Sequence, residues 1–258
     1  MRVTMPSLLG LTFLSLASAQ PVLAQTAEVR LTIDPKTSLA WWQLNPHLNH
    51  LWATTCPAEP SWRPGEGRSL AWASQYLTMR SKTGYAAILD TIIPLYPRRR
   101  ARPLCEEAVS GEITATDTTT WQGVHGFISV RADALTTGLD MRDTYARKSI
   151  LNTASYPTIR FDIDSVAQLQ KVRGDTLKGF VYGKFTLHGV AEPVSADLRT
   201  WREAGGRRVK AHFMVPAEDM TGKYGMSKMS LGLGVGGTVW KELHMGVDVV
   251  LVTAASGT

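Results

Sequence analysis

Apolar and polar residues alternate along many short segments of this chain, and this pattern constrains the fold more than any other feature of the sequence. A period of two places successive side chains on opposite faces of a β-strand. The alternation is clear at residues 29–33, 128–134, 159–163, 177–187, 194–198, 209–215 and 247–251. Strands with one apolar and one polar face predict an antiparallel sheet that is wet on one side.

So many strands of this kind predict an all-β fold in which the sheet closes on itself. Closure into a barrel, or packing as a sandwich, hides the apolar face and the edges of the sheet. We expect an antiparallel barrel of about eight strands with one short helix, from Met141 to Leu151. A barrel of this size can hold one small ligand, although a fully packed interior is the alternative. Small residues on the predicted inward faces favour a cavity, namely Ala132, Ala134, Gly179, Gly183, Ala196 and Ala211.

The first 24 residues are typical of a signal peptide. Arg2 precedes an apolar run at residues 8–16 that is too short to span a bilayer, and small residues follow it. We expect cleavage after Ala24, with Ala19 as the alternative site, which leaves a mature domain of residues 25–258. The sequence therefore predicts a periplasmic protein, with secretion as the alternative.

The charge of the chain is basic, with a formal net charge of +6 that includes Arg2 of the predicted signal. A basic balance ordinarily suggests nucleic acid, but export makes nucleic acid a poor partner. An anionic membrane surface is the more natural partner for an exported basic protein, if the charge serves more than solubility.

The segment at about 49–108 differs in amino-acid composition from the predicted strands. It is rich in proline and arginine and contains both cysteines of the chain, Cys56 and Cys105. An even number of cysteines in an exported protein favours a disulfide between them. We therefore interpret this segment as a long disulfide-tied insertion in the barrel domain, and not as a separate domain.

Motifs that would indicate catalysis are weak in this sequence. The glycine-rich stretch at 232–237 lacks the strand-then-helix context of a nucleotide-binding loop and suggests a hairpin or bulge. There is no G-x-S-x-G or H-E-x-x-H motif, so we expect no enzyme activity and no cofactor. His47 and His50 leave open a metal- or haem-binding redox protein. A filled barrel with a structural or interaction role is the third possibility.

Three stretches of the sequence resemble the YceI-like family of exported lipid-binding proteins. The first joins the Arg142–Asp143 helix to Ser155–Tyr156–Pro157–Thr158–Ile159–Arg160–Phe161; the second runs from Gly183 to Val194; the third is Lys223–Tyr224–Gly225–Met226. Their order and spacing agree with the family over residues 109–252. The sequence departs from the family at Tyr145, where the family has histidine.

This resemblance implies a lipocalin-like barrel with an elongated apolar cavity that binds a polyisoprenoid or a similar lipid, such as a quinone-like molecule. The predicted ligand contacts come from the inward faces of the strands, together with a tryptophan near the start of the chain and an arginine for an anionic head group. These residues are Trp42, Arg142, Ile159, Phe161, Ile163, Leu177, Val181, Phe185, Leu187 and Phe213. Other tryptophans of the dense run Trp41–Trp72 are expected to form a lid across the mouth of the barrel.

Overall fold

The computed structural model describes residues 28–46, 51–56, 107–136, 140–226 and 240–254 of the chain. Ten strands and four short helices make up these ranges. In chain order they are β1 (Val29–Ile33), β2 (Leu39–Pro46), β3 (Leu51–Thr54), β4 (Val109–Ala115), β5 (His125–Arg131), η1 (Ala132–Ala134), α3 (Asp140–Tyr145), η2 (Ala146–Ile150), β6 (Thr158–Arg173), β7 (Thr176–Leu187), β8 (Val190–Glu203), β9 (Gly206–Pro216), α4 (Ala217–Gly222) and β10 (Trp240–Thr253).

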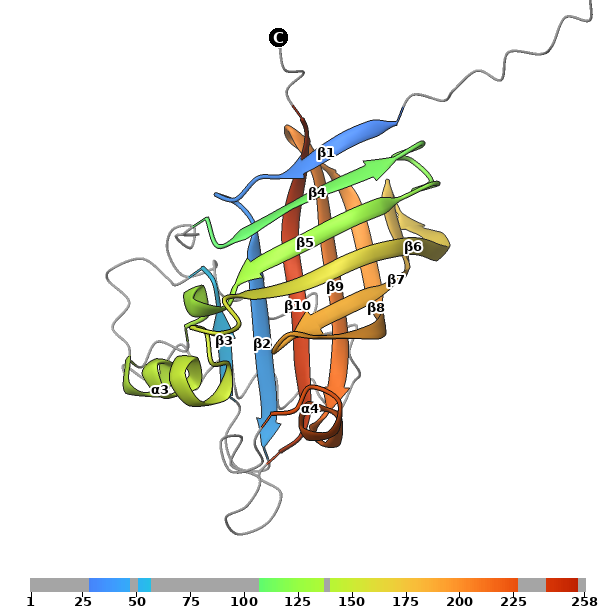
Figure 1. The fold of residues 1–258 in the computed structure, drawn as a ribbon. Coiled ribbons are helices and arrows are strands. Elements are labelled where there is room, and N and C mark those ends of the chain that lie inside the picture. Colours follow the sequence, from blue (N-terminus) through green and yellow to red (C-terminus); the bar gives the residue numbers. More distant parts are fainter. Residues whose placement is uncertain (1–27, 47–50, 57–106, 137–139, 227–239, 255–258) are drawn as a thin grey trace, which may run out of the picture.

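Eight of these strands form a closed antiparallel barrel (Figure 1). They are hydrogen-bonded in the order β1–β4–β5–β6–β7–β8–β9–β10, and β10 returns to β1 through pairs that run from Leu31–Thr253 to Ile33–Leu251. Strand β2 pairs with the part of β10 that precedes its pairing with β1, and β3 pairs with the other edge of β2. The predicted all-β antiparallel barrel of about eight strands is confirmed.

The two ends of the barrel are built differently. At one end, which we call the hairpin end, lie the β4–β5 loop (116–124) and the turns at 174–175 and 204–205. Gly174 and Gly205 have φ of 59° and 83°, a region that favours glycine and suits tight hairpin turns. At the other end, which we call the helical end, lie η1, α3, η2 and α4 (Figure 1).

Inward-facing apolar side chains of all eight strands form the core. One cluster contains buried residues of every barrel strand, among them Val109 of β4 and Val249 of β10, neither of which is exposed to solvent. A second cluster fills the helical end, where α4 buries Ala217 and Met220, one turn apart, against β7, β9 and β10. The alternating apolar residues of the strands therefore form the inner wall of the barrel, and the single turn of α4 covers part of the helical end.

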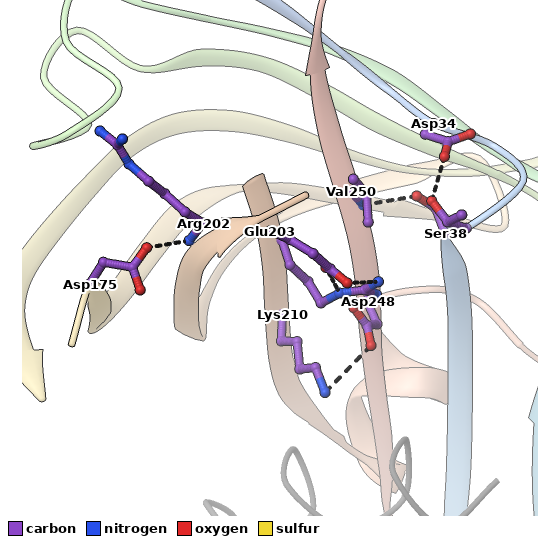
Figure 2. Close-up of polar contacts among 10 residues, drawn as sticks. Asp34, Ser38, Asp175, Arg202, Glu203, Lys210, Asp248 and Val250 are labelled. Carbon is purple, nitrogen blue, oxygen red and sulfur yellow. Dashed lines mark hydrogen bonds and ion pairs between the residues drawn. The ribbon is translucent and has the colours of Figure 1, made fainter. Parts of the chain in front are cut away.

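A polar network fixes the corner between β1 and β2 to the last strand (Figure 2). The backbone N–H of Val250 donates to Ser38 Oγ at 3.0 Å. The N–H of Asp34 donates to the carbonyl of Val250 at 2.8 Å. Nearby, the carboxylate of Asp248 lies 2.7 Å from Arg208 Nη1 and 3.4 Å from Lys210 Nζ. Because Asp248 is buried, two cations near it offset the cost of removing its charge from water.

The short helix expected from Met141 to Leu151 is confirmed: it is the α-helix α3, which continues as the π-helix η2 and ends at Ile150. One detail of the predicted strands is wrong. The strand expected through 128–134 ends at Arg131, because the chain turns into the 3-10 helix η1. Within the described ranges, no helix is long and apolar enough to cross a membrane.

The predicted insertion at 49–108 and the predicted wet outer face both need correction. Residues 51–54 are not part of an excursion but form β3, which pairs with β2. Residues 57–106 lie outside the described part of the chain. The outer face is not wet over β9 and β10, where Lys210, His212 and His244 are buried.

Candidate functional site

The interior of the barrel contains an apolar cavity with about 970 Å³ of space not occupied by atoms, open solvent at its mouth included. Every strand of the barrel other than β1 contributes to its wall, as does β2. The residues around it are almost all aliphatic or aromatic. They include Trp42, Ile113, Trp121, Ile128, Val130, Ile159, Phe161, Ile163, Val181, Phe185, Ala196, Leu198, Val209, Ala211, Phe213, Met245 and Val247.

Among the described residues, Arg160 is the only charged one at the cavity wall, and its guanidinium contacts Phe127 and Asp162. Its Cζ lies 3.8 Å from the centroid of the Phe127 ring, and its Nη2 lies 2.6 Å from Asp162 Oδ1. The side chains of Ile159 and Phe161, on either side of it in β6, belong to the core. The wall formed by β6 therefore presents hydrocarbon to the cavity.

Two small side chains open space between the larger ones. Ala196 of β8 and Ala211 of β9 lie at the cavity. Gly183, also predicted to leave room, does not, because a Cβ there would lie 2.9 Å from atoms of the Phe161 ring. Ala132 and Ala134 are buried in η1 and not on a strand facing the cavity.

Aromatic rings narrow the cavity toward the helical end. The ring of Phe213 lies 4.8 Å from that of Phe185, edge to face, and 6.4 Å from that of Phe161. Phe185 also contacts Tyr224, with centroids 6.0 Å apart, in the second core cluster. Edge-to-face pairs of this kind fix the rings relative to one another. This end of the cavity therefore has a fixed aromatic wall.

The structure brings most of the predicted ligand contacts together at this cavity. Leu177 and Leu187 are the exceptions among the strand residues, since they pack in the core and not at the cavity wall. Arg142 lies in α3, but its side chain is outside the described part of the structure. The seven at the cavity are Trp42, Ile159, Phe161, Ile163, Val181, Phe185 and Phe213. That any of the ten contacts a ligand stays a prediction.

Several other sequence predictions fall outside the described residues. These are His47 and His50, the glycine-rich stretch 232–237, Trp62, Trp72 and Cys105. Cys56 is fully buried, and the predicted Cys56–Cys105 bond stays a prediction. Within the ranges that can be described, no three His, Cys, Asp or Glu side chains are grouped to hold a metal ion.

His188 lies in the β7–β8 turn, where it is half-buried. Its φ is 53°, its ring lies 4.1 Å from that of Tyr156, and its Nδ1 is 3.2 Å from the carbonyl oxygen of Tyr224. The turn therefore removes His188 from the alternation of β7 and holds its ring against the helical end.

A pair of histidines is buried on the outer side of the barrel, between β9 and β10. His212 Nε2 lies 3.1 Å from His244 Nδ1, and the ring of His212 is nearly parallel to the indole of Trp41, with centroids 5.6 Å apart. Burial, together with the proximity of His244, lowers the pKa of His212 to about 3. Burial also lowers the pKa of His244, although Glu242 opposes that shift. Both imidazoles are therefore neutral at neutral pH.

Because of this buried histidine pair, we expect the folded protein to lose stability in mild acid. The unfolded chain takes up a proton at His212 near its ordinary pKa of 6.5, whereas the folded protein does so only near 3. The unfolded state therefore binds more protons between these values, and the free energy of unfolding falls by about 1.4 kcal/mol for each pH unit below 6.5. At pH 5 the expected contribution of His212 is a loss of about 2 kcal/mol.

Urea denaturation at pH 7 and pH 5 measures this effect. A His212→Gln variant should lose less stability between the two pH values than the wild type does. His125→Gln, at an exposed position, is the matched control and should keep the wild-type difference. Equal losses in all three proteins would show that His212 does not carry the acid sensitivity.

Comparisons with known proteins agree with the fold. A family model described as the YceI-like domain matches residues 106–251. A polyisoprenoid binding domain from Saccharophagus degradans, implicated in plant cell wall breakdown, is similar with a TM-score of 0.52 at 11% identity, over 88% of this chain and 99% of that one. BcnA from Burkholderia cenocepacia has a TM-score of 0.46 at 14% identity, over 57% of this chain and 85% of its own. No match was found among curated proteins.

Proposed function

The chain belongs to the YceI-like family, and we propose that it binds a polyisoprenoid or a similarly long apolar lipid and catalyses no reaction on it. The observation that carries this proposal is the composition of the cavity wall. In the part of the chain that the structure describes, the side chains of this wall are almost all aliphatic or aromatic. Arg160, the one charged residue among them, contacts Phe127 and Asp162. A wall of this kind suits a ligand that is itself almost entirely hydrocarbon.

The physical basis of binding is removal of the lipid chain from water. Each buried CH₂ group contributes about 0.8 kcal/mol, so affinity grows with the length of chain that the cavity encloses. Such binding needs no reactive group. The polyisoprenoid binding domain from Saccharophagus degradans supports this proposal by its fold alone.

We further propose that the protein works in the periplasm. The proposal rests on the signal-like residues 1–24 and on the two cysteines, whose pairing would need an oxidising compartment. A quinone-like lipid is an alternative ligand of the same class. The basic charge of the chain suits an anionic membrane surface from which a lipid could be taken up.

Native mass spectrometry of freshly purified protein tests these proposals together. The chain is expressed in full and recovered from the periplasm. We expect a chain that lacks residues 1–24, with a bound lipid that is released on activation and identified after extraction. Reduction should then add the mass of two hydrogen atoms if Cys56 and Cys105 are paired. A protein that carries no lipid, and takes up no added prenyl lipid, would instead support a filled barrel without a carrier role.

A further inference from the structure

A buried arginine lies at the hairpin end of the barrel, next to the cavity-lining Trp121 and not itself at the cavity wall. Arg207 is in phase along β9 with Val209 and Ala211, which line the cavity, and it is only 9% exposed. Its Nε donates a hydrogen bond to Thr200 Oγ1 at 3.0 Å. Among the described residues, no carboxylate lies within 4.0 Å of its guanidinium. A buried charge in a protein is ordinarily paired, so this one calls for an explanation.

The charges around Arg207 do not neutralise it by contact. Arg202 is its direct cross-strand partner in the β8–β9 hairpin, and like charges in this position repel. Asp175 and Asp117 act on Arg207 through their charges, without an ion pair to it among the described residues. Asp117 accepts hydrogen bonds from Thr119 and Thr120 of its own loop, and Asp175 accepts the backbone N–H of Arg202 at 2.6 Å (Figure 2). The pKa of Arg207 is lowered, chiefly by burial.

A buried hydrogen-bond donor that has no acceptor among the described residues lies beside this arginine. Trp121, in the β4–β5 loop, is 4% exposed, lines the cavity, and lies with its ring centroid 5.6 Å from Arg207 Cζ. Its backbone has a φ of 58°, which is uncommon for a residue other than glycine. Its Nε1–H is buried and, in the described part of the structure, has no hydrogen-bond acceptor. A buried N–H without an acceptor is costly, and an acceptor atom of a ligand would remove that cost.

From these two donors we propose that the hairpin end of the cavity binds the singly charged oxyanion, such as a carboxylate, at one end of the lipid. The proposal rests on the proposed lipid-binding function and adds an orientation to it. The guanidinium of Arg207 supplies the charge and hydrogen bonds, and the Nε1–H of Trp121 supplies one more. The guanidinium of Arg207, which forms no ion pair among the described residues, suits a ligand group with one negative charge. The hydrocarbon of the lipid then extends along β8 and β9 toward the aromatic wall at the helical end.

Two ligands of equal length separate this proposal from lipid binding in general. Geranylgeranoic acid and geranylgeraniol differ only at the terminal group, and their affinities for the mature protein are measured by isothermal titration calorimetry at neutral pH. We expect the acid to bind at least about tenfold more tightly, because hydrogen bonds to charged groups are stronger than neutral ones. Arg207→Met, which keeps the apolar stem, should lower the affinity for the acid to that for the alcohol. The affinity for the alcohol should stay unchanged.

Lys184→Gln is the matched control, because it removes an exposed positive charge from the outer face of β7. It should keep the preference of the wild type for the acid. Trp121→Phe removes the N–H together with part of the ring that lines the cavity, so its readout is the ratio of the two affinities. That ratio should fall several-fold, which gives a second test if Arg207→Met does not fold. Binding of both ligands with equal affinity would overturn this proposal and leave lipid binding intact. If neither ligand binds, the proposed function fails with it.

Discussion

Ala196→Phe is expected to lower the affinity for a long prenyl lipid by about a hundredfold while the barrel stays folded. Ala196 lies at the cavity wall on β8, where a phenyl ring would occupy space that the lipid needs. Displacing three or four CH₂ groups of the lipid forfeits about 3 kcal/mol, which corresponds to about two powers of ten in the dissociation constant. The measurement is a titration with geranylgeraniol, and the circular dichroism spectrum shows whether the sheet is retained.

Ala191→Phe provides the control for this substitution. Ala191 lies on the same strand but is exposed, so the same ring is added without entering the cavity. Its affinity should match that of the wild type. If Ala196→Phe binds the lipid as the wild type does, the cavity is not the binding site. Equal weakening in both variants would point to a general effect of the added ring.

Gly246→Ala is expected to have the largest effect on stability, a loss of about 3 kcal/mol or more. A Cβ at this position of β10 would lie 2.5 Å from an atom of the Trp41 indole and 2.7 Å from the backbone oxygen of Ala211. The indole is held in turn against the ring of His212, so it cannot move aside without disturbing the histidine pair. Overpacking in a rigid surrounding costs about 1–3 kcal/mol, and a backbone oxygen leaves little room for relief.

The free energy of unfolding, measured with urea, tests this expectation against Gly222→Ala. A Cβ at Gly222, the last residue of α4, would meet no atom within 4 Å. That variant should be as stable as the wild type or up to about 1 kcal/mol more stable, since alanine restricts the unfolded chain. Similar stabilities for the two variants would show that the contact between Gly246 and Trp41 is not tight.

The period of two in the sequence was sufficient to predict the architecture of the barrel. It placed strands at seven of the ten positions where the structure has them and gave the inward face of each. It did not reveal β2, because Ala40, Trp41 and Trp42 are apolar without alternation. Both are shielded from solvent: Trp41 packs against His212, and Trp42 lies at the cavity. A strand covered on both sides has no polar face for the pattern to show.

The wall of the cavity was easier to predict than its ends. Phe161, Phe185 and Phe213 follow from the strand pattern, because an inward apolar side chain in a small barrel reaches the interior. Trp121 does not follow, because its position depends on how the β4–β5 loop folds back, with Thr116 Oγ1 and N–H both donating to the carbonyl of Gln122. The alternation of β9 does place Arg207 on the inward face, because it is in phase with the inward residues of that strand. A charged residue at the end of a strand is ordinarily exposed to solvent, so the sequence alone does not favour burial of Arg207.

The pairing of the first barrel strand with the last sets the order in which this protein can fold. Leu31 of β1 pairs with Thr253 of β10, although almost the whole chain separates them in sequence. No hairpin within the barrel can replace this pairing of the first strand with the last. Contacts between residues so far apart in sequence slow folding, because the entropy of closing the loop must be overcome before they form. The hairpins from β4 to β9 can assemble as the chain emerges. The cylinder cannot close until its C-terminal residues are available, so a chain truncated before β10 would leave an open sheet with two unpaired edges.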